Sequence, residues 1–129
     1  MSILDSITGT ETEIEEAKND KELNDLLVEG EHIQSAFKSF RDMFAFTNYR
    51  LILVDKQGMT GKKVEYRSIP YTSITSFSVQ TAGSLFDRNV EVFLWLKGGS
   101  SLTKAVHKNT DIMGLQRTLS AFVLNELET

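Results

Sequence analysis

Apolar residues change their spacing near Gly30, from the three- and four-residue intervals of a helix to the alternation of strands. Before Gly30, a thin apolar stripe runs from Ile14 to Leu27, and Thr10 and Glu13 have the spacing of a capping box. The pattern predicts one amphipathic helix that starts after Thr10, ends near Gly30 and packs on one side only.

Residues 31–106 carry the twofold pattern of β-strands, which is clearest in a hairpin over Arg41–Asp55. The first strand of the hairpin alternates, whereas the run Leu51–Val54 after the Thr47-Asn48 turn is apolar throughout, which indicates a strand covered on both faces. Five further strands are predicted over residues 31–40, with a bulge, and over 62–69, 74–81, 90–96 and 102–106. The strand over residues 90–96 is also apolar on both faces and is therefore expected to be covered on both sides.

A final helix is predicted to begin at Asn109 or Thr110, because both residues are good N-caps. Its apolar stripe is broad enough to cover one open end of a sheet. Seven antiparallel strands in a meander, followed by one such helix, bury their apolar side by curling into a barrel or sandwich that the helix closes. The fold class is therefore mainly β with helices.

The composition is that of an ordinary globular domain, with 129 residues, 40% hydrophobic and 25% charged. No cysteine is present, which excludes disulfides, thiolate nucleophiles and Cys-ligated metal sites. We expect a cytoplasmic protein, because the sequence shows neither the roughly 20 apolar residues of a membrane span nor a basic segment before an apolar stretch at its start.

The net charge of −4 is unevenly distributed. Residues 1–29 hold nine acidic side chains and two lysines, a charge of −7, which leaves +3 for the remainder. Such a segment can lie against the basic body or stay in solvent, and the solvated or loosely docked arrangement is favoured because surface ion pairs stabilise little. Nucleic acid is not an expected partner of an acidic chain without a basic stripe.

No motif predicts catalysis, a cofactor or a metal. His32 and His107 are the only histidines and lie far apart in sequence, and no serine occupies a Gly-x-Ser-x-Gly elbow. The segment Gly58–Lys63 has glycines too close together for a phosphate-binding loop and precedes a strand instead of a helix. We therefore expect a protein that is not an enzyme.

The segment Thr47-Asn48-Tyr49-Arg50-Leu51-Ile52-Leu53 resembles the Thr-Asn-x-Arg-Leu-Ile segment of the bacterial pleckstrin-homology (PH) domain family. Further similar segments follow in the same order, among them Val54–Gly58, Ser68–Tyr71 and Phe77–Val79. The resemblance covers about residues 30–125 and implies a PH-like split barrel. That fold has seven antiparallel strands in two nearly orthogonal sheets, capped by a C-terminal helix. Residues 30–129 would form this domain, and residues 1–29 an acidic N-terminal helical extension.

The resemblance implies a binding module, because PH-like folds serve as binders of lipids or proteins. We expect a non-catalytic interaction module that self-associates into a homo-oligomer and has an unidentified protein partner. The candidate contacts for self-association are the open sheet edges and the second apolar face of the strand over residues 90–96, which carries Phe93 and Trp95. These two aromatic residues could meet either another subunit or the N-terminal helix. Like Phe77 and Phe86, they could instead belong to the core, which is the commoner place for large aromatic residues.

The alternative is a peripheral binder of anionic lipid headgroups through Lys38, Arg41, Lys62 and Lys63. Eukaryotic PH domains that resemble this fold bind phosphoinositides with basic residues between their first two strands. Here that connection is short and has no dense basic cluster. Arg50 is interpreted as a solvated turn residue.

Overall fold

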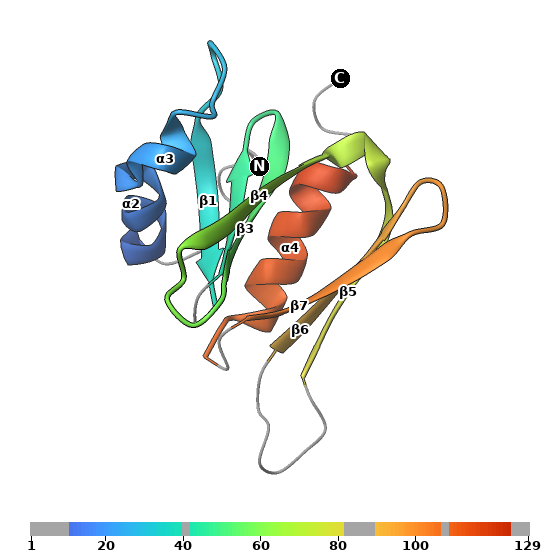
Figure 1. Ribbon diagram of the computed structural model, residues 1–129. Coiled ribbons are helices and arrows are strands. Elements are labelled where there is room, and N and C mark those ends of the chain that lie inside the picture. The colour runs from blue at the N-terminus through green and yellow to red at the C-terminus, as the bar shows by residue number, and fades with distance from the viewer. Residues whose placement is uncertain (1–10, 40–41, 82–89, 107–108, 125–129) are drawn as a thin grey trace.

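The computed structural model describes residues 11–39, 42–81, 90–106 and 109–124. Within these ranges the chain forms two antiparallel sheets (Figure 1). The first sheet has the order β1 (Ile33–Lys38), β2 (Met43–Thr47), β3 (Arg50–Gln57) and β4 (Lys63–Pro70). A short 3-10 helix, η1 (Tyr71–Ser73), leads to the second sheet, β5 (Ile74–Thr81), β6 (Val90–Leu96) and β7 (Ser101–Val106).

The seven strands and their meander order confirm the prediction from the sequence. β5 and β6 have the predicted bounds, and the bulge expected in β1 lies between Ile33 and Ser35. β1 is shorter than predicted because Glu31 and His32 precede the ladder. The hairpin turn consists of Asn48 and Tyr49, one residue later than expected.

β3 is covered on both faces, as its unbroken apolar run predicted. Leu51 and Leu53 point into the main core between the two sheets, whereas Ile52 and Val54 belong to a second apolar cluster on the opposite face of the first sheet. All four side chains are buried. β3 is thus the strand around which two cores are built.

The N-terminal segment forms two helices, α2 (Glu11–Asn19) and α3 (Lys21–Asn24), so the prediction of one helix reaching Gly30 is wrong. The break is at Asp20, whose extended backbone and side-chain oxygen cap α3 by accepting a hydrogen bond from the Leu23 N–H at 3.0 Å. Asn24 donates from its side-chain amide to the Ala17 carbonyl oxygen and secures the end of α2. Gly30, at a φ of 83°, then turns the chain into β1.

These helices lie on the outer face of the first sheet, on the side away from the C-terminal helix (Figure 1). Ala17 and Leu23 are fully buried there, against a cluster that includes Ala45, Ile52 and Val54. The solvated or loosely docked arrangement favoured for the acidic segment is therefore wrong for its described part, which packs on its own sheet.

The C-terminal helix, α4 (Ile112–Val123), lies between the two sheets and covers the open side of the main core (Figure 1). Its N-cap is Asp111, which accepts a hydrogen bond from the Gly114 N–H at 3.0 Å, so the predicted start at Asn109 or Thr110 is wrong. Phe122 stacks on Phe46 of the first sheet, with 5.4 Å between ring centroids. The predicted capping role of this helix is confirmed.

Candidate functional site

β6 buries one face and leaves the other open. Val90, Val92 and Leu94 point into the main core, whereas Phe93 and Trp95 alternate to the outer side, where Trp95 is 42% exposed. The two rings stack on each other, with centroids 6.2 Å apart and planes inclined by 23°. The prediction that this strand is covered on both sides is therefore wrong for the described part of the molecule.

The residues around the two rings are small and mostly uncharged. Ser76 and Ser101 lie opposite Trp95 on the neighbouring strands, and Ser78 and Thr103 lie opposite Phe93. We call this surface the aromatic face and define it by the outward residues of the three strands: Ser76, Ser78, Gln80, Glu91, Phe93, Trp95, Ser101, Thr103 and Ala105. Among them, Glu91 is the one charged residue.

The described N-terminal helices do not reach this face, because they pack on the other sheet. The N-terminal helix was one of the two partners considered for Phe93 and Trp95. Residues 11–28 do not contact them. Phe77 points inward and packs against the main core, in agreement with the commoner place of aromatic residues. Phe86 lies outside the described residues.

Of the four basic residues proposed for lipid binding, the three that the structure describes do not form one compact set. Lys38 lies at the end of β1, where its ammonium group pairs with Glu16 at 2.7 Å. Lys63 begins β4, on the opposite edge of the same sheet, and Lys62 precedes it; both side chains are exposed. Arg41 lies outside the described residues.

A buried ion pair at the start of β3 was missed by the sequence interpretation. Arg50 donates from Nε to Glu31 Oε2 at 2.8 Å and from Nη2 to Glu31 Oε1 at 2.9 Å. The Glu31 side chain is completely buried, and that of Arg50 is 23% exposed. The prediction of a solvated Arg50 is therefore wrong. No periodic signal could have revealed the pair, because its members lie 19 residues apart in different elements.

The Glu31 carboxylate is held in its charged form. Burial by itself raises the pKa of Glu31, but hydrogen bonds from Arg50, Thr47 and the Val28 N–H, together with the Arg50 charge, outweigh burial and lower the pKa. The Thr47 hydroxyl donates at 2.7 Å and the Val28 N–H at 3.0 Å. A buried charge is tolerated here because its oxygens are fully engaged.

The same turn is joined to two other parts of the fold, the segment before β1 and the 3-10 helix η1. Asn48 accepts a hydrogen bond from the His32 N–H at 2.8 Å and donates to the Gly30 carbonyl oxygen at 2.9 Å. Tyr71 of η1 donates to the Thr47 carbonyl oxygen at 2.6 Å, and burial raises the pKa of its hydroxyl far above the usual range. These contacts make the turn a structural joint.

The described histidine and the described carboxylates do not gather in one place. None of them form a group of three or more His, Asp or Glu side chains arranged to hold a metal ion. His32 is exposed and its Nε2 lies 3.1 Å from the Gln34 side-chain amide, while His107 lies outside the described ranges. No helix in the part of the chain that the structure describes is long and apolar enough to cross a membrane.

Two antiparallel sheets of four and three strands, closed by a C-terminal helix, define a protein of the pleckstrin-homology class. The family model described as bacterial PH domain matches residues 2–123, and the chain belongs to this family. The family resemblance seen in the sequence is thus confirmed.

Relatives and solved structures agree with this assignment. The uncharacterized protein YjqA of Bacillus subtilis (strain 168) is 44% identical over 123 residues, which cover 94% of this chain and 98% of YjqA. The crystal structure of a pleckstrin homology domain from Shewanella amazonensis SB2B is 42% identical with a TM-score of 0.75, covering 95% of this chain and 98% of that one. A DUF1696 family protein with a pleckstrin-homology domain from Shewanella loihica PV-4 is 44% identical with a TM-score of 0.69, covering 85% and 92%.

Proposed function

We propose that this PH-like domain is a non-catalytic interaction module that self-associates through the aromatic face. The observation that carries the proposal is the stacked pair of Phe93 and Trp95, which lies outside both apolar clusters, with Phe93 half-buried and Trp95 exposed. Tryptophan and other aromatic residues at the centre of a surface are the side chains that most often dominate the energy of protein association.

A second copy of the chain fits this face better than a charged partner does. In a twofold interface each patch meets an identical patch, so a patch with several like charges would repel itself. The aromatic face carries only Glu91 at its margin, and hydroxyl groups flank the rings. The chain as a whole is charged at −4, so the aromatic face is a place where two copies can approach with little repulsion.

The size of the face sets the expected strength. It supplies fewer residues than the roughly 20 to 30 per side of a standard stable interface. We therefore expect a reversible association that is populated at high micromolar concentration.

Light scattering coupled to size-exclusion chromatography tests the proposal across micromolar concentrations. The wild type should show a mass that rises with concentration, and the double variant Phe93→Ser/Trp95→Ser should remain at the mass of one chain. Met113→Ser is the matched control, because Met113 is 66% exposed on α4, away from the aromatic face. A wild type that stays monomeric throughout, or a double variant that associates equally well, would overturn the proposal.

A second candidate, anionic-lipid binding, is favoured by one specific observation. Met59 is fully exposed at the tip of the β3–β4 loop, close in sequence to the exposed Lys62 and Lys63. An apolar tip beside two cations suits a membrane surface, although two lysines supply only about 2 kcal/mol of attraction to anionic lipid.

Sedimentation with phosphatidylserine-containing vesicles tests this second candidate. Binding should be detectable at low salt, weaken at physiological salt because exposed charges are screened, and fall further in Lys62→Gln/Lys63→Gln. The control variant Lys18→Gln/Lys97→Gln removes two exposed charges elsewhere and should bind like the wild type. Equal losses in both variants would show that only net charge matters, and salt-independent or absent binding would exclude a site at this loop.

A further inference from the structure

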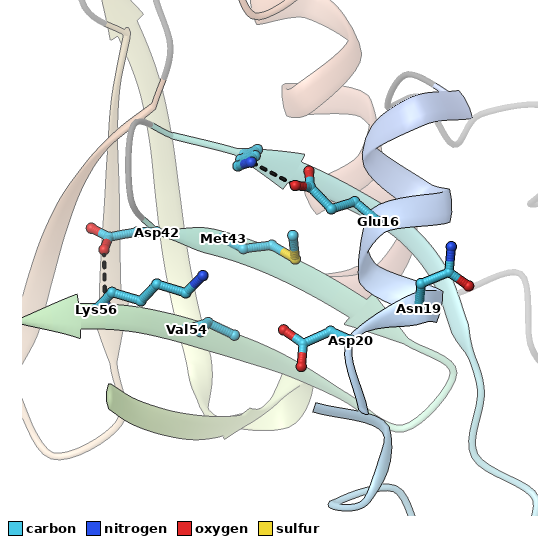
Figure 2. A pocket seen from close by; sticks show the side chains of 8 residues that line it. Glu16, Asn19, Asp20, Asp42, Met43, Val54 and Lys56 are labelled. Atoms are coloured by element: carbon cyan, nitrogen blue, oxygen red, sulfur yellow. Dashed lines mark hydrogen bonds and ion pairs between the residues drawn. The ribbon is translucent and has the colours of Figure 1, made fainter. Parts of the chain in front are cut away.

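A pocket opens between α2 and the outer face of the first sheet, close to the start of β2 and away from the aromatic face (Figure 2). Its volume of about 370 Å³ is at the lower end of the range for small-molecule sites. The residues that line it are Glu16, Asn19, Asp20, Lys38, Asp42, Met43, Val54 and Lys56.

The floor of the pocket is apolar and firmly held. Met43 and Val54 are direct partners in the β2–β3 ladder, and both are more than nine-tenths buried. They belong to the same cluster as Ala17 of α2, so the floor is part of the second core. An apolar side chain of a ligand could therefore rest on it and be shielded from water.

Some charges around this floor are already engaged within the protein. Glu16 pairs with Lys38 at 2.7 Å, and Asp42 accepts a hydrogen bond from the Lys56 backbone N–H at 3.2 Å. Burial, and then the neighbouring charge of Asp55, raise the pKa of Asp42 above its ordinary value.

Two opposite charges remain available. The Lys56 ammonium group makes no ion pair with any described residue, and Asp20 uses one carboxylate oxygen to cap α3 while its other oxygen has no such bond. Figure 2 shows Lys56 and Asp20 on either side of Val54, with the apolar floor between them. Within the part of the chain that the structure describes, the pocket thus presents the Lys56 ammonium group and one oxygen of Asp20 as unpaired opposite charges across an apolar surface.

We propose that this pocket binds a free α-amino acid with an apolar side chain, whose ammonium group pairs with Asp20, whose carboxylate pairs with Lys56 and whose side chain rests on Met43 and Val54. A purely cationic ligand would leave Lys56 without a partner and would be repelled by it. A purely anionic ligand would face the carboxylates of Asp20 and Asp42. A molecule carrying both charges satisfies both ends of the pocket.

Titration of the labelled protein with L-leucine, followed by amide NMR shifts, tests the proposal. A ligand of this size should bind in the millimolar range and should shift residues of α2, β2 and β3. Isoamylamine carries only the ammonium group and 4-methylpentanoate only the carboxylate, so each should bind about tenfold more weakly than leucine because one charge-assisted bond is lost.

The variants Lys56→Gln and Asp20→Asn should each weaken leucine binding about fivefold or more, whereas Lys62→Gln and Asp25→Asn should leave it unchanged. Asparagine at position 20 retains a side-chain oxygen for the N-cap, so folding should be preserved. Absence of leucine-dependent shifts in the wild type, or equal affinity for isoamylamine and leucine, would overturn the proposal. The Phe93→Ser/Trp95→Ser variant should still bind leucine, so this test and the self-association test can fail separately.

Discussion

Glu31 lies in an unusual environment for a glutamate. A glutamate side chain without any exposed surface is costly unless every oxygen is paired, and here Arg50, Thr47 and the Val28 N–H supply the donors. The contact ties the segment before β1 to the start of β3. The charge of Glu31 therefore contributes to stability only while both members of the ion pair, Glu31 and Arg50, are present.

Replacing this carboxylate should destabilise the protein in a pH-dependent way. The pKa of Glu31 in the folded protein lies below its ordinary value of 4.5, so its stabilising effect is complete above that pH and is lost as the pH falls through the folded pKa. We expect Glu31→Gln to lower the free energy of unfolding by about 2 kcal/mol at neutral pH, and by progressively less in acid. Urea unfolding followed by circular dichroism at neutral and acidic pH measures both values.

Glu29 offers a matched control two residues earlier. Its side chain is exposed, so Glu29→Gln should change the free energy of unfolding by at most about 0.5 kcal/mol at either pH. If Glu31→Gln destabilised the protein equally at neutral pH and in acid, the loss would come from packing and not from the charge.

The helices α2 and α3 act as a third layer on the first sheet. Their contact is apolar at Ala17 and Leu23 and polar at its margin, where the Tyr66 hydroxyl donates to Glu22 at 3.0 Å. Burial, with the nearby Glu22 carboxylate, raises the pKa of Tyr66 to about 12. The acidic segment is thus attached mainly by its few apolar residues, because its exposed charges contribute little.

Truncation of one buried side chain in this layer should greatly weaken the packing of the helices on the first sheet. We expect Leu23→Ala to lower the free energy of unfolding by about 2 to 4 kcal/mol, because Leu23 is fully buried and leaves a cavity against β2 and β3. Leu26→Ala, in the same segment but at a residue 40% exposed, should cost less than about 1 kcal/mol. Chemical unfolding of both variants measures the difference, and equal losses would mean that the layer is not held at Leu23.

Local pattern predicted the strands well and the helices less well. The bounds of β5 and β6 were predicted correctly from the alternation of apolar and polar residues. This alternation is a local property of the sequence. The break at Asp20 was missed because the apolar stripe continues across it from Ile14 to Leu27. Whether an aspartate stays within a helix or caps the next one is decided by what lies beneath it, and that information is not local.

At the scale of the whole molecule, two strands with similar patterns have different surroundings. β3 and β6 are both apolar on both faces, yet the outer face of β3 is covered by α2 and α3 whereas that of β6 is open. Sequence could identify both faces but could not decide which sheet the N-terminal helices would cover. The candidate pair Phe93 and Trp95 was therefore foreseeable, and its exposure was not.

The charged sites were even harder to predict from sequence than the aromatic face, because each one depends on pairing between residues that lie far apart in the chain. The partner of Arg50 lies 19 residues away, and Lys38 meets Glu16 from a different element. The pocket under α2 also went unpredicted, because it exists only where that helix docks beside β2 and β3. Composition indicated an acidic segment and a basic body, but only the docking showed which charges remain available.

The turn from Thr47 to Arg50 has a consequence for how relatives of this chain are recognised. Three side chains of this turn make hydrogen bonds within the protein. Thr47 and Arg50 bind Glu31, and Asn48 binds the backbone of His32 and Gly30. The short sequence signature that these residues form therefore indicates a structural feature of the fold. A newly sequenced protein that carries it can be assigned this joint between its N-terminal segment and its first sheet.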